Sequence, residues 1–239
     1  MNLLAPMWVN SLYRQLPCYS DYLAKDRLER SIRYIQTHPS DVYCLSEVEG
    51  SDVMLLDKRL GREWTVLYTS HEEGFWSNWL EDGAAWKSNG VCVAVRNSVF
   101  QLRGAHHVSL GTGCRACHVL CELVSSGLLV SISSVHFSTD ESKWTEVQAL
   151  LAFLKNVSCD LSIISGDYNF SDVQLLTSLG YREGPGMQTT PIPQGRIDHT
   201  LVKGDVLVSS VVHDLGDPCS TVIGNGSDHY ATTSVITLL

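Results

Sequence analysis

The chain has 239 residues, 44% of them hydrophobic, and a mean hydropathy close to zero, so it can bury one sizeable core. Its 17 basic and 26 acidic residues give a formal net charge of −9, which argues against nucleic-acid binding through a broad basic surface. An acidic site that holds a metal ion can still bind one phosphodiester. No apolar window reaches the roughly 18 residues of a membrane-spanning helix and no secretory leader is visible. We therefore expect a soluble, monomeric, intracellular protein, cytoplasmic or nuclear, that folds as one domain over residues 1–239.

The first half of the chain alternates helices with apolar strands. Residues 26–38 place Leu28, Ile32 and Ile35 at helical spacing and end before Pro39, which predicts an amphipathic helix packed on a sheet. A strand at 42–46 and a short helix around 51–60 follow. Further strands are expected near 64–69, 90–96, 116–124 and 128–136, and the turn signal Ser126-Gly127 predicts that the last two form an antiparallel hairpin.

The second half continues this alternation. Residues 138–141 supply N-cap candidates for a helix from about 141 to 156, and LSIIS at 161–165 reads as a buried strand that stops at Gly166. Later strands are expected near 196–202, 205–213 and 230–238. Because some strands are joined by hairpins and others by helices, the pattern favours a layered α/β sandwich over a plain doubly wound sheet.

Polar side chains interrupt the ends of several of these strands. Glu47 closes VYCLSE, where a carboxylate can reach a divalent cation without being trapped in the core, although alone it could equally be a surface acid. In SGDYNF, Asp167 and Asn169 are two residues apart and project to one side if the backbone stays extended. Alone, such a turn is more often a satisfied Asx turn.

Two histidines and two further acids extend this pattern. Asp198 lies inside the otherwise apolar strand RIDHTLV, and a buried acid is costly unless it has a partner such as an imidazole. The motif GSDHY offers that imidazole in His229 and another carboxylate in Asp228, and His136 ends the strand VSISSVHF. A lone histidine at a strand end is more often structural, but polar groups at five strand ends together indicate a functional site.

The cysteines favour reduced thiols over a disulfide framework, which would suit a small secreted chain. Four of the eight fall inside or beside apolar runs: Cys44, Cys92, Cys121 and Cys159. Another group could in principle hold zinc: His106, His107, Cys114, Cys117 and His118. Since a second Cys-x-x-Cys pair is absent, the sequence favours a loop that leads into a half-buried strand there.

The ordered set of motifs resembles the endonuclease/exonuclease/phosphatase superfamily over nearly the whole chain. The resemblance is carried by Asn2 in NLLAP, Glu47 in LSEVEG, His136 in SVHF, Asp167 and Asn169 in SGDYNF, Asp198 in RIDHTLV, and Asp228 and His229 in SDHY. It implies a four-layered α/β sandwich with two central mixed β-sheets flanked by helices, and phosphoester hydrolysis that depends on Mg²⁺ or Mn²⁺. NLLAP resembles deadenylase-like members, whereas GDYNFSD resembles tyrosyl-DNA phosphodiesterase-like ones.

The resemblance also implies residue roles. Glu47 would be the principal metal ligand, with Asn2 beside it and Asp228 completing the metal side. Asp167 would orient or deprotonate the attacking water, and Asn169 would hold that water and a phosphate oxygen.

The remaining roles concern the phosphate. His229, paired with Asp198, would contact the phosphoryl oxygens as charge builds in the transition state, and His136 would bind phosphate or assist the leaving group. Arg115 is a candidate phosphate clamp because of its guanidinium geometry and its place just before a strand, although a surface arginine is the alternative.

These observations predict a metal-dependent phosphodiesterase that acts on nucleic acid or a nucleotide-like diester. A phosphatase, a lipid phosphodiesterase of the inositol-phosphate or sphingomyelin class, and a non-catalytic binding member of the superfamily stay open as alternatives. The stretch from Ser70 to Asn89 holds four large aromatic residues, Phe75, Trp76, Trp79 and Trp86. They could stack on bases, face a lipid or anchor a long loop.

Overall fold

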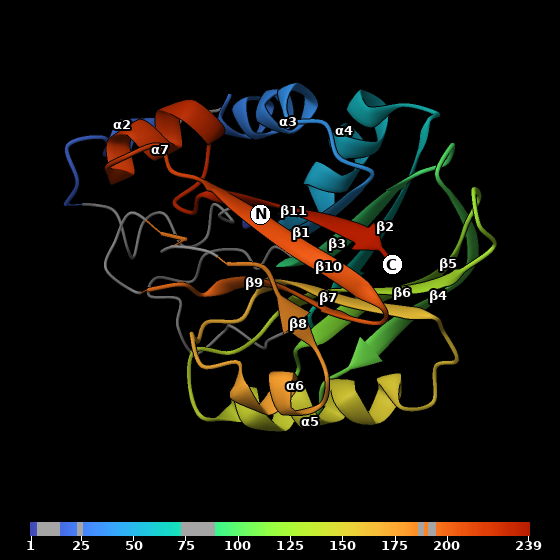
Figure 1. The fold of residues 1–239 in the computed structure, drawn as a ribbon. Helices are drawn as coiled ribbons and strands as arrows, with labels where there is room; N and C mark the ends of the chain where they lie inside the picture. Colours follow the sequence, from blue (N-terminus) through green and yellow to red (C-terminus); the bar gives the residue numbers. More distant parts are fainter. Residues whose placement is uncertain (4–14, 23–25, 73–88, 186–188, 191–194) are drawn as a thin grey trace.

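The computed structural model describes residues 1–3, 15–22, 26–72, 89–185, 189–190 and 195–239. Its strands form two central layers with helices on both outer sides (Figure 1). The four-layered α/β sandwich expected from the sequence is therefore confirmed. The four aromatic residues of the stretch from Ser70 to Asn89 lie outside the described residues.

The larger layer is a six-stranded mixed sheet in the order β4-β5-β6-β7-β9-β8. Its strands are β4 (Phe100–Ser109), β5 (Arg115–Leu123), β6 (Leu129–His136), β7 (Leu161–Asp167), β8 (Arg182–Glu183) and β9 (Asp198–Lys203). Among the described strands of this sheet, only β6 and β7 pair in parallel, and α5 (Ser142–Leu154) makes the crossover between them. The predicted antiparallel hairpin is the β5–β6 pair.

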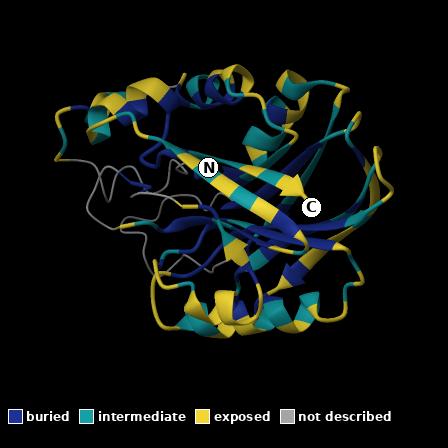
Figure 2. Ribbon diagram, viewed as in Figure 1, coloured by how far each residue is buried: buried dark blue, intermediate teal, exposed yellow. Residues whose placement is uncertain are grey.

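The second strand layer contains two smaller groups. One is a three-stranded sheet, ordered β1-β3-β2, of β1 (Val42–Glu49), β2 (Trp64–Ser70) and β3 (Asn89–Arg96). The other is the two-stranded pair of β10 (Val206–His213) and β11 (Ala231–Leu238). The apolar core between the layers consists mainly of valine, isoleucine and leucine side chains, together with Phe100 and two cysteines. Figure 2 shows the strands that carry them as buried.

The helices cover the two outer faces. Four lie against the smaller strand layer: α2 (Tyr19–Tyr22), α3 (Arg27–Thr37), α4 (Gly50–Leu60) and α7 (Pro218–Asn225). Beside α5, the opposite face carries α6 (Gln174–Ser178). In the described part of the chain, no helix is long and apolar enough to cross a membrane.

Several elements differ from the sequence-based expectation. The strand expected at 42–46 runs on to Glu49, and β4, α2, α6 and α7 were not expected. Most residues of β4 are exposed because it is an edge strand, so it lacks the apolar run by which a buried strand is found. The helices α2 and α6 have only 4 and 5 residues, too few to show helical periodicity.

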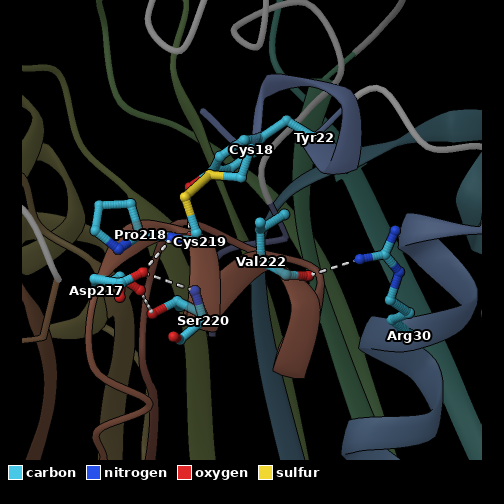
Figure 3. The surroundings of a disulfide bond; sticks show 9 residues. Cys18, Tyr22, Arg30, Asp217, Pro218, Cys219, Ser220 and Val222 are labelled. Atoms are coloured by element: carbon cyan, nitrogen blue, oxygen red, sulfur yellow. Dashed lines mark hydrogen bonds between the residues drawn. A yellow bond between two sulfur atoms is a disulfide. The ribbon is translucent and has the colours of Figure 1, made fainter. Parts of the chain in front are cut away.

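One pair of cysteines corrects the expectation of reduced thiols. Cys18 and Cys219 form a disulfide between residues that are 201 positions apart, whereas six other cysteines, including the four expected core thiols, are free. Figure 3 shows the disulfide at the first turn of α7, where the Asp217 carboxylate accepts hydrogen bonds from the backbone N–H groups of Cys219 and Ser220. Two cysteines so far apart along the chain carry no local signal of pairing.

Candidate functional site

Three strand ends of the large sheet bring two acids and one imidazole together. The parallel register of β6 and β7 places His136 beside Asp167, and the antiparallel register of β7 and β9 places Asp167 beside Asp198. All three side chains are buried. His136 Nε2 lies 3.8 Å from Asp167 Oδ2 and 3.9 Å from Oε1 of Glu47, which comes from the other layer.

The N-terminal residues connect the two layers at this point. Asn2 forms a parallel β-bridge with Ser46 of β1, and its side-chain amide donates to Glu47 Oε1 at 2.7 Å and to Asp167 Oδ2 at 3.1 Å. The hydroxyl of Ser46 donates to the carbonyl of Val135 at 3.0 Å and accepts the N–H of Asp167 at 3.3 Å. These contacts fix the spacing between the two carboxylates.

Two of the site residues have an unusual backbone conformation. Glu47 and Asn169 both have φ +54°, a left-handed value that residues other than glycine seldom adopt. Glu47 lies where the pairing register of β1 shifts between Leu45 and Val48, so a bulge turns its side chain toward the site. Such outliers cluster at functional sites, because the surrounding structure must hold them against their conformational cost.

The turn after β7 is held by Asn169. Its backbone N–H donates to Asp167 Oδ1 at 2.9 Å, which is an Asx turn, and its side-chain amide donates to the carbonyl of Phe137 at 2.7 Å. Gly166 precedes the turn at φ +148°, where an added Cβ would come within 2.0 Å of the Val135 carbonyl oxygen. Only glycine fits at this close approach of β7 to β6.

His229 and Asp198 form a buried pair. His229 Nδ1 donates to Asp198 Oδ2 at 2.7 Å, and Nε2 of the same ring lies 3.7 Å from Asp167 Oδ2. Burial by itself would lower the pKa of His229, but three surrounding carboxylates raise this pKa well above its ordinary value. The histidine is therefore held as an imidazolium beside Asp198, and this pairing lowers the pKa of Asp198 against the opposing effect of burial.

The pKa values of Glu47 and Asp167 shift in the direction opposite to that of Asp198. Burial raises the pKa of Glu47 and of Asp167 above their ordinary values, and the nearby imidazoles compensate only in part. When both side chains are ionised, their negative charges therefore lie in a buried region that is shielded from water. An added cation would stabilise both ionised side chains.

The donor set fits a hard divalent cation. Among the described residues, two groups have ligand atoms within 4.8 Å of one another: Glu47 with His136 and Asp167, and Asp167 with Asp198 and His229. The second group already contains an ion pair, so the first is the better candidate. Carboxylate and amide oxygens with one imidazole are ligands that Mg²⁺ or Mn²⁺ accepts.

Two predicted residues lie at the margin of this cluster. Asp228 is buried, and its Oδ2 is 4.0 Å from His229 Nε2. Arg115 begins β5, its side chain is 36% exposed, and it pairs with Glu72 at 3.4 Å. In the part of the chain that the structure describes, Arg115 has no hydrogen bond or ion pair with the central acids.

Several supporting residues were not found from the sequence. Arg27 of α3 is buried and donates to the carbonyls of Leu3 and Gly226 at 2.6 and 2.9 Å, so it joins the segments that carry Asn2 and Asp228. Three hydroxyl side chains likewise form hydrogen bonds with the backbone of segments that carry site residues: Ser46, Thr189 and Ser227. No local motif marks these residues, although an arginine on the buried face of an amphipathic helix is a usable signal.

Of the histidines and cysteines around Cys114, His106 and His107 lie in β4, and Cys117 and His118 lie in β5. Cys114 and Cys117 are buried, and their Sγ atoms lie 3.6 and 3.5 Å from the carbonyls of His136 and Leu67. Burial raises the pKa of both thiols. Among the described residues, this group offers no three ligand atoms within 4.8 Å of one another. The strand expected near 116–124 is β5.

Comparisons with known proteins address the family and the fold of this chain. Residues 18–229 match the model of the Endonuclease/Exonuclease/phosphatase family. No curated protein matches the sequence significantly.

Solved structures have the same fold at low identity. An endonuclease/exonuclease/phosphatase from Bacteroides vulgatus aligns over 100% of this chain and 97% of its own at 16% identity and TM-score 0.73. ANGEL2, a 2′,3′-cyclic phosphatase, aligns over 99% of this chain and 92% of its own at 13% identity and TM-score 0.73. A humanized D. rerio TDP2 aligns over 92% and 96% at 15% identity and TM-score 0.65.

Proposed function

Because the chain belongs to the endonuclease/exonuclease/phosphatase family, we propose that the cluster around Asp167 hydrolyses a phosphodiester with the help of a divalent cation. The observation that carries the proposal is the meeting of Asn2, Glu47 and the His229–Asp198 pair at Asp167. A phosphoester hydrolase is the activity that the family and its structural neighbours support.

The proposed metal side contains Glu47 with Asn2, His136 and Asp167 around it, and Asp228 near its margin. Mg²⁺ or Mn²⁺ would supply positive charge to the phosphate oxygens there. The raised pKa values of Glu47 and Asp167 support this assignment, since a bound cation would offset the cost of burying them ionised.

The residues of the chain would divide the reaction between them. Asp167 orients a water molecule and takes its proton as the water oxygen attacks phosphorus, and Asn169 holds that water and a phosphate oxygen. The ester P–O bond on the opposite side breaks. His229, kept protonated by Asp198, donates to the phosphoryl oxygens as negative charge builds on them.

The departing oxygen needs a proton or a nearby positive charge. His136 lies on the opposite side of Asp167 from Asp198 in the sheet, so it is suited to contact the leaving group or the phosphate. Arg115 would clamp a phosphate oxygen at the rim of the site.

We infer that the substrate is a nucleic acid or a nucleotide-like diester. One structural neighbour is a D. rerio TDP2 complexed with a single-strand DNA product, which supports a diester of this class. The chain itself carries a net charge of −9, so recognition would depend on the local site and not on a wide basic surface. A phosphatase of cyclic or terminal nucleotide phosphates is the second candidate, supported by the likeness to ANGEL2.

A substrate panel tests this proposal. Bis-aryl and mono-aryl phosphates, single-stranded RNA and DNA, sphingomyelin and inositol phosphates would each be assayed with Mg²⁺ and with chelator. We expect turnover of the diesters in Mg²⁺, and its loss in Asp167→Asn and His229→Ala. Turnover that is independent of metal, or undiminished in both variants, would overturn the mechanism.

The single-domain organisation, the monomeric state and the intracellular location stay predictions. The disulfide between Cys18 and Cys219 bears on the last of these, since disulfides persist mainly in oxidising compartments. It counts against a location in the cytoplasm or nucleus.

A further inference from the structure

His71 is a buried histidine that the proposed reaction does not use. It follows the last residue of β2, is only 2% exposed, and donates its backbone N–H to the carbonyl of Asn89 at 2.9 Å. Its ring nitrogen Nδ1 accepts the backbone N–H of Arg115 at 3.1 Å. A side chain from the smaller strand layer therefore holds the first residue of β5 in the larger one.

Glu72, the next residue, strengthens the same connection. Its backbone N–H donates to the carbonyl of Gly113 at 2.8 Å, and its carboxylate lies 3.4 Å from the guanidinium of Arg115. Three contacts thus join residues 71–72 to residues 113–115. The exposed ion pair contributes little by itself, so the buried hydrogen bond to His71 is the contact that fixes the backbone of Arg115.

His71 also lies near one residue of the site, His136. The centroid of its ring is 6.0 Å from that of His136, and the two planes are tilted by 52°. Burial, together with the positive charges of His136 and Arg115, lowers the pKa of His71 to about 3. A neutral ring that accepts at Nδ1 carries its proton on Nε2, so the hydrogen bond to Arg115 fixes the tautomer as well.

We propose that His71 is a positioning residue, which acts on the substrate through Arg115. This inference rests on the proposed phosphodiesterase function. A guanidinium recognises a phosphate by paired, directional hydrogen bonds, so its usefulness depends on where its backbone is held. His71 sets that place for Arg115, and its ring forms part of the wall beside His136.

A second buried histidine, His118, is the control for a role in stability alone. His118 of β5 is 1% exposed, burial lowers its pKa to about 4, and its Nδ1 lies 3.1 Å from the hydroxyl of Ser133. Its ring lies against those of His106 and Phe153, with centroids 5.9 and 4.9 Å away. Replacing His118 should lower stability as replacing His71 does, without an effect on the site.

The test uses two substitutions of similar size, of which one keeps a hydrogen-bond acceptor and the other does not. In His71→Asn the amide oxygen can take the place of Nδ1 and accept the Arg115 N–H, whereas His71→Leu removes the acceptor. Steady-state kinetics would use bis(4-nitrophenyl) phosphate with Mg²⁺, and thermal unfolding would be recorded for each variant. We expect kcat/KM to fall roughly 10- to 100-fold in His71→Leu, mainly through KM, and to recover largely in His71→Asn.

A double-mutant cycle separates positioning from general destabilisation. In an Arg115→Ala background, His71→Leu should reduce kcat/KM by much less than it does alone, because its effect passes through Arg115. Full additivity of the two losses, or a loss in His118→Leu as large as that in His71→Leu, would overturn the inference.

Failure of the proposed function gives a different result. If the wild-type protein hydrolyses no phosphoester in Mg²⁺, the proposed function is wrong and binding of inorganic phosphate, measured by calorimetry, replaces kinetics. Weaker phosphate binding in His71→Leu with recovery in His71→Asn then supports positioning. Equal binding in the wild type and both variants overturns it.

Discussion

His229 donates a hydrogen bond from Nδ1 to Asp198 at 2.7 Å, although the two residues are 31 positions apart. The backbone at Asp198 is fixed by Thr189, whose Oγ1 accepts hydrogen bonds from the N–H groups of Ile197 and Asp198, both at 3.0 Å. The orientation of the imidazole is therefore fixed before any substrate binds. Catalytic groups that are held in this way lose little by reorganisation during the reaction.

Asp198→Asn should reduce kcat by roughly 10²- to 10³-fold and change KM little. The amide lacks the negative charge that raises the pKa of His229, so the imidazolium is no longer favoured. The measurement is steady-state hydrolysis of a diester in Mg²⁺. Asp205→Asn, at an exposed aspartate directly before β10, is the matched control and should keep wild-type kinetics. A kcat for Asp198→Asn within twofold of the wild type would contradict this role.

A divalent cation should raise the thermal midpoint of the wild-type protein. Burial raises the pKa values of Glu47 and Asp167, which means that their ionised forms destabilise the metal-free fold at neutral pH. A ligand that binds only the folded state at 100 times its Kd adds about 2.7 kcal/mol. Differential scanning calorimetry with Mg²⁺ and with chelator measures this gain.

The variant Glu47→Gln tests the same cation site by removing one of its negative charges. Because the amide carries no charge, the variant should be more stable than the wild type in chelator and gain less stability from Mg²⁺. Glu141→Gln, at an exposed residue beside α5, should behave like the wild type. Equal Mg²⁺-dependent shifts in all three proteins would argue that the cation does not bind at Glu47.

Loss of the disulfide should lower the free energy of unfolding by roughly 2–5 kcal/mol, because the cross-link closes a long loop in the unfolded chain. Cys18 and Cys219 are 201 residues apart. Denaturant unfolding of Cys18→Ser measures the loss, and a thiol reductant should lower the wild type to the same level. Cys159→Ser, which changes a free thiol, is the control. A wild type that is insensitive to reductant would refute the cross-link.

Acid should destabilise the fold through His118. Its folded-state pKa is lowered to about 4 by burial and by His106, whereas an unfolded histidine titrates near 6.5. Between these values the unfolded chain binds more protons than the folded one, so stability falls as pH decreases. The loss should reach on the order of 2–3 kcal/mol by pH 4. In urea unfolding from pH 7 to 4, His118→Leu should start less stable and show a shallower decline, while a parallel decline would contradict the assignment.

Much of the fold could be predicted from local patterns. The amphipathic spacing of Leu28, Ile32 and Ile35 and the apolar runs of the central strands report burial directly, because burial repeats with the period of the element. The edge strand β4 and the helix α7 were missed, since an exposed strand and an eight-residue helix carry weak periodicity. The disulfide was missed for a related reason, because pairing across the whole chain has no local trace.

The supporting residues of the site were also beyond sequence reasoning. Ser46, Arg27 and His71 are ordinary residue types at unremarkable places in the sequence. Each matters only because it bridges two segments that are distant along the chain. Hydrogen bonds of this kind depend on packing between layers, which no short motif encodes.

The sequence by itself determined which chemical groups stand at the strand ends: a carboxylate at Glu47, an acid and an amide in SGDYNF, and an imidazole in GSDHY. Only the tertiary structure decided that these ends meet. The parallel pairing of β6 with β7 sets His136 against Asp167, and the packing of β1 on the large sheet brings Glu47 to both. Strand register and layer packing are non-local, because they are fixed by burial of whole sheet faces and not by the residues that carry the chemistry.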